Sequence, residues 1–431
     1  MKKVYSIIYK LHKILSIPLS ILFILWYVSG LVMLYHPFPR LNDTIRPVKE
    51  VDYAVTDSLW QQVPATFRSC QFIFSGNHQL IKVDGEVLGA YHPTKDDILS
   101  IADDYNIIIH HIDTLADIDR WIPFNRLMSH LPIYRLVSNE EDYLYISSQT
   151  GEILQYNTKK ARLWAYVGAI PHYVYYKPLR RDSELWKDVV ILLSGIATIS
   201  VILGLIISIR FLIKRKRLKL FRKATWQTHY LFGLISGIFM FAFIFSGMMS
   251  LAKVPEILIE RHPYKAPLLE KSHYDIQALP SHFKRCDLAD DIKPIFRSYI
   301  TEKMEISPAT LTNGVSITSN EVEEIINSRL QEDVLSTETV VNDWFYYQNG
   351  EKGFKTETTH HSVYWNEKGY FKVMDRNSKA RYICYQVLHT FKIPFLNTKE
   401  PLRLTAMWIL LLSGLVIVIS GTILSYRIVR K

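Results

Sequence analysis

The sequence has few cysteines and lacks the common nucleotide-binding and hydrolase motifs. Only three cysteines occur among 431 residues, Cys70, Cys286 and Cys384, with no CxxC or CxxCH pair. Covalent c-type haem attachment and a cysteine zinc site are therefore unsupported, and one disulfide stays open. No GxGxxG follows a strand, and no P-loop, HExxH or GxSxG is present. The chain is not expected to oxidise NADPH by itself, cleave ATP or hydrolyse peptides.

Charge is almost absent from four long segments. These apolar windows are Ile14–Tyr35, Val189–Ile213, Tyr230–Ala252 and Leu404–Ser425. Each holds roughly twenty apolar residues, the length that an α-helix needs to cross about 30 Å of hydrocarbon. The sequence therefore predicts four transmembrane helices, with membrane lipid as a partner.

The basic residues indicate how these helices are oriented. The net charge is +10, and the short link between the second and third windows is strongly basic. Cytoplasmic loops of membrane proteins carry such an excess of Lys and Arg, so no nucleic-acid partner is needed to explain it. The basic N-terminus precedes an apolar stretch that is too long for a cleaved signal peptide, so we expect a retained anchor. Both termini and the link are expected in the cytoplasm. The basic residues of the link are Arg210, Lys214, Arg215, Lys216, Arg217, Lys219, Arg222 and Lys223.

This topology divides the chain into seven segments. They are residues 1–35 (cytoplasmic N-terminus and first transmembrane helix), 36–187 (first outer domain), 188–213 (second helix), 214–228 (basic cytoplasmic link), 229–252 (third helix), 253–403 (second outer domain) and 404–431 (fourth helix and cytoplasmic tail).

The chain contains an internal repeat with a period of about 217 residues. The sequence HKILSIPLSILFILWYVSG begins at His12, and HYLFGLISGIFMFAFIFSG begins one period later, at His229. The same offset takes His172 to His389. The second and fourth windows share a Leu-Ser-Gly triplet that departs from this register by a slippage of two positions. Because the first and third helices run in the same direction, the repeats are parallel and related by an axis along the membrane normal.

The two outer segments have the pattern of α+β domains. Alternating apolar residues around turn residues predict three hairpins and one helix. The hairpins join residues 71–75 with 79–83, 143–147 with 152–156, and 362–365 with 370–373, and the helix covers 320–330. The expected fold is therefore membrane α-helical plus α+β, a four-helix bundle of two parallel repeats with two extracytoplasmic α+β domains.

These motifs resemble the PepSY-associated transmembrane family of bacterial inner-membrane proteins. The matching features are Leu11-His12 and Ser29-Gly30 in the first helix, the stretch Tyr134–Glu152 with its Thr-Gly-Glu turn, and Leu388-His389 ahead of the last helix. The resemblance covers most of the chain and implies PepSY-like outer domains. The second PepSY-like segment departs from the pattern, since Gly369 stands where Thr-Gly-Glu is expected. Some family members resemble dihaem ferric-siderophore reductases, which implies two b-type haems.

Histidine pairs are the expected haem ligands, because two imidazoles close both axial positions of one iron. His12 and His229 are predicted to hold an inner haem, since they open equivalent helices at the cytoplasmic face. His172 and His389 are predicted to hold an outer haem. An alternative outer site uses His36 with one of these two, although the repeat equivalent of His36 is Lys253. The doublets His110-His111 and His360-His361, and the acidic residues near Trp121, are expected to be ordinary surface groups.

The function expected from these observations is transmembrane electron transfer. Electrons would come from a quinol or a cytoplasmic reductase and reduce an outer acceptor. The family resemblance implies siderophore-bound ferric iron as this acceptor, and so a haem-dependent metal reductase. A PepSY membrane protein that restrains an envelope peptidase or sensor, without catalysis, is the alternative. A transporter built on parallel repeats is a third reading, which the scarcity of ionisable residues within the helices disfavours.

Overall fold

The structure is a computed structural model that describes residues 2–42, 45–89, 91–301, 304–311, 316–346, 348, 350–397 and 399–429. The chain forms two compact units. The first, here called the helical unit, comprises Met1–Phe38, Leu163–Arg261 and Asn377–Lys431. The second, the sheet unit, comprises Pro39–Arg162 and His262–Arg376.

Within the described residues, three helices are long and apolar enough to cross a membrane. They are α1 (Lys2–Met33), α7 (Ser183–Arg215) and α13 (Glu400–Val429). The third apolar window instead forms two helices, α8 (Ala224–Ile235) and α9 (Gly237–Ala252), bent by 60° at their junction. The expected apolar helices of a membrane protein and the α+β class are confirmed. The prediction of one continuous helix over the third window is wrong.

The break at Ser236 has a local and a tertiary cause. Glycine is a poor helix former, and Gly237 directly follows the break. A Cβ on Gly237 would lie 2.8 Å from a methyl carbon of Leu205 on α7, so the close approach of α7 requires glycine here. The first repeat has Pro18 inside α1, at the position equivalent to Ile235, and proline cannot continue the helical hydrogen-bond ladder. Both repeats thus weaken their first helix at the same level.

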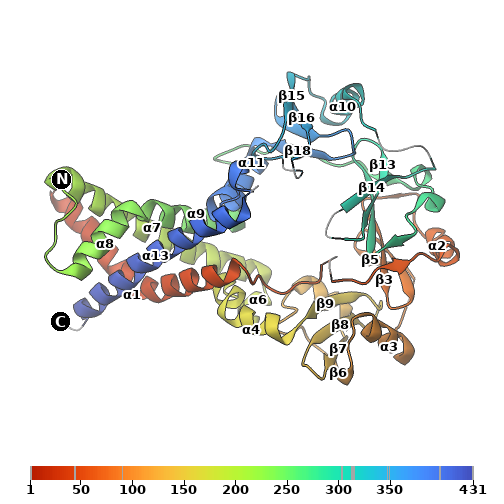
Figure 1. Cartoon of the computed structure of the whole chain (residues 1–431), viewed down its shortest axis with the longest axis horizontal. Helices are drawn as coiled ribbons and strands as arrows, with labels where there is room; N and C mark the ends of the chain where they lie inside the picture. The colour runs from red at the N-terminus through yellow and green to blue at the C-terminus, as the bar shows by residue number, and fades with distance from the viewer. Residues whose placement is uncertain are drawn as a thin grey trace. The chain divides into compact units, whose positions relative to one another are not determined.

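The long helices of the helical unit pack side by side. In Figure 1, α1 and α7 lie alongside α9 and α13, and α1 begins and α13 ends at the same end of the unit as the α7–α8 link. Short helices complete the unit or lead into it: α4 (Lys159–Val167), α5 (Ala169–Tyr173), α6 (Lys177–Arg180), α11 (Arg376–Tyr382), the π-helical turn η5 (Ile383–His389) and α12 (Pro394–Asn397). The apolar core between the long helices contains Leu19, Phe23, Tyr27, Ala197, Val201, Met240, Phe243, Ile244, Met407, Leu411, Ile417 and Val418.

A six-stranded antiparallel sheet contains strands from both outer segments. Its order is β14-β13-β12-β3-β4-β5, and the two segments meet where β3 pairs with β12. The repeat equivalent of Gln71 is Leu288, and Gln71 pairs with the adjacent residue, Asp287. Equivalent positions of the two repeats therefore meet at this pair of strands, and the repeat relates the two halves of the sheet. The strands are β3 (Cys70–Ser75), β4 (His78–Val83), β5 (Glu86–Val87), β12 (Arg285–Asp290), β13 (Pro294–Tyr299) and β14 (Met304–Pro308).

Each outer segment continues with a helix and a four-stranded meander. In the first segment these are α3 (Lys95–Asp104), β6 (Ile109–Leu115), β7 (Ile133–Ser138), β8 (Tyr143–Ser147) and β9 (Ile153–Asn157). In the second they are α10 (Ser319–Ile325), β15 (Ser336–Val340), β16 (Gly353–Glu357), β17 (His361–Trp365) and β18 (Phe371–Asp375). The three predicted hairpins are confirmed, and the predicted helix over 320–330 forms as α10 with a following π turn, η4 (Ile326–Leu330).

The two meanders place a glycine in the same turn. Gly151 lies between β8 and β9 with φ +69°, and Gly369 lies between β17 and β18 with φ +97°. Both values fall in the left-handed region that favours glycine. The degenerate second segment therefore keeps the turn although it has lost the Thr-Gly-Glu sequence.

The remaining elements of the sheet unit are short. They are β1 (Lys49–Glu50), α2 (Tyr53–Trp60), β2 (Thr66–Phe67), η1 (Asn125–His130), β10 (Leu269–Glu270), η2 (Lys271–His273), η3 (Ile276–Ala278) and β11 (His282–Phe283). The three cysteines are free, so the disulfide that the sequence left open is not formed.

Candidate functional site

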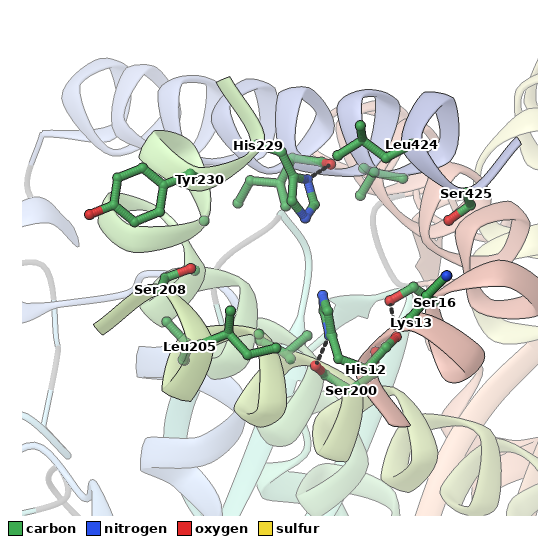
Figure 2. A pocket seen from close by; sticks show the side chains of 18 of the residues that line it. His12, Lys13, Ser16, Ser200, Leu205, Ser208, His229, Tyr230, Leu424 and Ser425 are labelled. Carbon is green, nitrogen blue, oxygen red and sulfur yellow. Dashed lines mark hydrogen bonds between the residues drawn. The ribbon is translucent and has the colours of Figure 1, made fainter. Parts of the chain in front are cut away.

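His12 and His229 face each other inside the helical unit. Their ring centroids are 6.5 Å apart. Figure 2 shows the two rings pointing into one cavity from opposite walls. Nδ1 of His12 lies 2.9 Å from the Ser200 carbonyl oxygen on α7, and Nδ1 of His229 lies 3.1 Å from the Ile417 carbonyl oxygen on α13. Ser200 and Ile417 are themselves repeat equivalents, so the two repeats hold their histidines in the same way.

These hydrogen bonds fix the protonation of both rings. A carbonyl oxygen accepts but cannot donate, so Nδ1 of His12 and of His229 must each carry the proton. The lone pair of each neutral ring is then on Nε2, the nitrogen that is left for a metal. A donor bond from the second nitrogen to a backbone carbonyl is the usual way in which proteins orient a metal-binding histidine. Both rings of the inner pair therefore have the tautomer that a metal-binding histidine needs.

His172 and His389 form a second facing pair with the same arrangement. Their ring centroids are 6.1 Å apart. Nδ1 of His172 lies 3.1 Å from the Ser29 hydroxyl, and Nδ1 of His389 lies 3.3 Å from the Ser246 hydroxyl. Nδ1 of His389 also lies 3.0 Å from the Phe243 carbonyl oxygen. Ser29 and Ser246 are repeat equivalents, so the repeat again accounts for both serine contacts.

The second pair is held in its neutral form. Burial, and then the repulsion from His389, lowers the pKa of His172 to about 3. Burial likewise lowers the pKa of His389. A histidine with a lowered pKa is neutral at neutral pH, and a neutral ring has one nitrogen free to bind a metal. For His389 the Phe243 carbonyl oxygen places the proton on Nδ1, so the free nitrogen is Nε2. The surroundings of this pair thus suit ligation.

The spacing of the rings fits two imidazoles bound on opposite sides of one metal ion. A metal to nitrogen bond of about 2.0 Å, plus roughly 1.1 Å from that nitrogen to the ring centre, on each side of the ion, places the two centroids about 6.2 Å apart. The observed values are 6.5 Å for His12 and His229 and 6.1 Å for His172 and His389. Stacked imidazoles lie closer, as His262 and His360 do at 4.0 Å, whereas the edge contact of His262 with His361 has a similar spacing of 6.4 Å. The spacing of both facing pairs is therefore compatible with a metal ion between the rings, and the way in which the Nδ1 atoms are held favours one.

Glycines lie beside the rings of the inner pair at positions that the repeat relates. A Cβ on Gly204 would lie 2.9 Å from Cε1 of His12, and one on Gly421, the repeat equivalent of Gly204, would lie 3.0 Å from Cε1 of His229. Any side chain at either position would push the imidazole from its place. The contacts of α7 and α13 thus follow the ungapped repeat offset, and the two-residue shift suggested by the Leu-Ser-Gly triplets is wrong here.

The glycines beside the second pair are also repeat equivalents. A Cβ on Gly247 would lie 3.1 Å from Cε1 of His389, whereas one on Gly30 would lie 3.7 Å from Cε1 of His172. Glycine thus accompanies each of the four histidines, with the tighter contact at His389.

A cavity surrounds the inner pair. The enclosed space between its walls measures about 160 Å³, and the cavity opens to solvent beyond it. The lining residues are Tyr9, His12, Lys13, Ser16, Ser20, Phe23, Ser200, Val201, Gly204, Leu205, Ile207, Ser208, Phe211, Phe221, Trp226, His229, Tyr230, Gly233, Gly237, Met240, Ile417, Val418, Gly421, Thr422, Leu424 and Ser425. All of them except Phe211 and Phe221 form pairs of repeat equivalents.

The structure places His36 differently from the two facing pairs. Its ring stacks on Trp164, with centroids 4.2 Å apart and an interplanar angle of 10°. His172 faces His389 instead, as the preferred outer assignment expects. The contact of His36 with an aromatic ring is the packing expected of an interfacial histidine.

The expectation that both histidine doublets are surface groups is wrong for His361, which is buried between the carboxylate and carbonyl groups that it contacts. Nδ1 of His361 lies 2.9 Å from a Glu332 carboxylate oxygen, and its Nε2 lies 2.6 Å from the His262 carbonyl oxygen. Asp119 accepts hydrogen bonds from Arg135 and from the Tyr145 hydroxyl. Among the residues described, no group of three or more His, Cys, Asp or Glu side chains is placed to hold a metal ion.

Sequence reasoning identified the four facing histidines but missed the groups that orient them. The carbonyl acceptors on α7 and α13 carry no side-chain signature, so no motif could reveal them. Gly204 and Gly421 did carry a signal, since the repeat offset relates them within the second and fourth windows. Comparison with models of known families finds no match to the chain, and no curated protein matches it.

Proposed function

We propose that this chain is a membrane-embedded b-type haem protein that transfers electrons to an acceptor outside the cytoplasm. The observation that carries the proposal is the pair of facing imidazole couples at repeat-related positions, each with ring centroids 6.1–6.5 Å apart. Their Nδ1 atoms are held by hydrogen bonds, so their Nε2 atoms remain for a metal. His12 with His229, and His172 with His389, would be the axial ligands.

A haem fits these sites better than a bare metal ion. Each site offers two protein ligands, and a third or fourth protein ligand is not supplied by the described residues around it. A porphyrin supplies four further nitrogens, so two histidines complete the six ligands of an iron. The macrocycle at His12 and His229 would lie in the cavity that opens to solvent beside these rings. Haem bound in this way supplies one-electron transfer, and the protein controls it through the axial ligands and the polarity of their surroundings.

The length of α1 between the two pairs sets the distance that electrons must travel. Ser29, which contacts His172, lies further along α1 than His12. The helical rise from His12 to Ser29 is about 26 Å. It is shorter than the span from His12 to His36, which is about 36 Å. The second pair is thus the better outer site on geometric grounds as well.

The proposed topology places both termini and the basic link in the cytoplasm of a bacterial inner membrane. Figure 1 supports it, because α1 starts, α13 ends and the link between α7 and α8 lies at the same end of the helical unit. The last turn of α7 carries Lys214 and Arg215, which suits a cytoplasmic helix end. The outer segments 36–187 and 253–403 would then lie on the other side. The bacterial location rests on the family resemblance.

We take siderophore-bound ferric iron as the acceptor and a quinol or a cytoplasmic reductase as the donor. The acceptor follows from the resemblance to dihaem ferric-siderophore reductases. Two axial histidines leave no open position on the metal, so a ferric chelate would be reduced without coordinating it. The chain would then act as a metal reductase, with the ferric chelate as its substrate.

The absorption spectrum of detergent-purified protein tests the proposal. Protein from haem-replete cells should show a reducible b-type spectrum with about two haems per chain, as expected for two axial histidine pairs. Because both axial positions are filled, carbon monoxide should leave the reduced spectrum unchanged. Colourless protein from such cells would contradict the proposal and favour a non-enzymatic PepSY protein that binds an envelope peptidase or sensor.

A further inference from the structure

The residues that line the cavity at His12 and His229 occupy repeat-related positions, but several of these positions carry different side chains in the two repeats. At several repeat-related positions of the lining the two residues are identical, as for Gly204 and Gly421 and for Val201 and Val418. A symmetric cavity of this kind would accept a haem in two orientations related by a half turn. Haem itself lacks that symmetry, because both of its propionate groups lie on one edge. Residues that differ between the two halves therefore decide which orientation is bound.

The two side walls of the cavity differ in charge and in hydroxyl groups. Figure 2 shows Lys13, Ser16 and Ser425 on one side, and Tyr230 with Ser208 on the other. Lys13 is the repeat equivalent of Tyr230, and Ser425 is the equivalent of Ser208. Ser16 corresponds to a glycine, and its hydroxyl donates to the His12 carbonyl oxygen one turn earlier on α1. Ser425 and Ser208 match each other, so the main difference between the two walls is the cation of Lys13 on one and the phenol of Tyr230 on the other.

Lys13 is the sole Lys, Arg, Asp or Glu among the described residues that line the cavity. Its side chain is exposed and also lines the cavity, as suits a long side chain with an apolar stem and a charged end. No carboxylate among the lining residues competes for this charge. A ligand that brings its own carboxylate into the cavity would therefore meet one cation, at one side.

We propose that Lys13, with the Ser425 hydroxyl beside it, forms a carboxylate subsite that binds the haem propionates and selects one orientation of the haem. The inference rests on the proposed function, since it assumes that haem is the ligand of the inner pair. Lys13 is a positioning residue here, because it contacts the carboxylate edge and not the metal. Because only one of the two equivalent positions carries a cation, Lys13 would determine which edge of the haem faces each repeat.

The test compares iron protoporphyrin IX with its dimethyl ester, which lacks the carboxylates. Both are titrated into apoprotein of the full chain carrying His389→Ala, so that the inner pair is the pair left intact, and binding is followed by absorbance. Lys13→Met should weaken binding of the free acid by about tenfold, as expected for the loss of one charge-assisted hydrogen bond at a partly exposed site. Binding of the dimethyl ester should be unchanged, and Lys13→Arg should bind the free acid like the parent protein.

Two further variants separate orientation from simple charge. Lys10→Met is the matched control, because Lys10 is also exposed on α1 but is not among the described residues that line the cavity. It should bind both porphyrins like the parent protein. The exchange Lys13→Tyr with Tyr230→Lys moves the cation to the equivalent position, so it should restore binding of the free acid with the haem turned by half a turn. The pattern of haem methyl resonances in NMR spectra reports that reversal.

The outcomes distinguish this inference from the proposed function. If neither porphyrin binds to the wild-type chain, the haem proposal itself fails. If both bind, but Lys13→Met weakens the acid and the ester equally or not at all, the subsite is wrong and the haem proposal stands. Should Lys13→Met not fold, the comparison is made with Lys13→Gln and Lys13→Arg. Equal affinity of the wild-type inner site for acid and ester would also overturn the subsite.

Discussion

The glycine beside His12 allows a sharp test of the inner site. In Gly204→Ala, the new Cβ would lie 2.9 Å from Cε1 of His12, well inside ordinary van der Waals contact. The ring cannot retreat easily, because its Nδ1 is held by the Ser200 carbonyl oxygen one turn earlier on α7. Such overpacking costs about 1–3 kcal/mol. Haem affinity at the inner pair should therefore fall by roughly 5-fold to 150-fold.

The control for this substitution is on the same helix. A Cβ on Gly195 would meet the Met248 sulfur at 3.6 Å, an ordinary contact with a flexible side chain. Both variants replace glycine by alanine inside α7, which favours the helix by about 1 kcal/mol in each case. Haem titration of the purified apoproteins, with circular dichroism to verify folding, isolates the effect on the histidine. Equal haem affinity of folded Gly204→Ala and Gly195→Ala would refute the reasoning.

The outer pair offers an internal comparison of the same kind. The contact at Gly247 is tight, 3.1 Å from Cε1 of His389, whereas the one at Gly30 is 3.7 Å from Cε1 of His172. Gly247→Ala should therefore lower outer-site haem affinity by a few-fold, toward the lower end of the overpacking range of about 1–3 kcal/mol. Gly30→Ala should leave it unchanged. The reverse order of these two effects would show that the haem does not lie between these rings.

Three further predictions concern the ligands and the topology. His12→Ala and His229→Ala should each remove about one haem per chain and leave the other spectrally intact, and full haem content in both variants would exclude the inner assignment. His389→Ala should lose the outer haem and reoxidise slowly with a ferric siderophore, while His36→Ala keeps both haems because its ring stacks on Trp164. Loss of the outer haem in His36→Ala alone would move the site there. A reporter fused at residue 218 should be cytoplasmic and reporters in the two outer segments external, and an external signal at 218 would overturn the topology.

Local patterns in the sequence determined the helices, the hairpins and the identity of the histidine pairs. Runs without charge predict α1, α7 and α13, since helix formation over an apolar stretch depends on neighbouring residues. Alternation around glycine turns likewise predicts the hairpins of β3 with β4 and of β8 with β9. The repeat offset singled out His12, His172, His229 and His389, because a repeat relates positions whatever their contacts. These features need no knowledge of packing.

Only the tertiary structure decided the features that depend on contacts between distant segments. The break at Ser236 follows from the approach of Leu205 on α7 to Gly237, which no local pattern reports. The pairing of β3 with β12 joins strands from the two separate outer segments, so its register is set by packing in the shared sheet. The facing of His172 and His389, and the stacking of His36 on Trp164, depend on where α5 and η5 place these rings, since an offset along the sequence does not say which side chains meet. The orientation of the rings came from backbone carbonyl groups, which every residue has and which become specific only once the helices pack against each other.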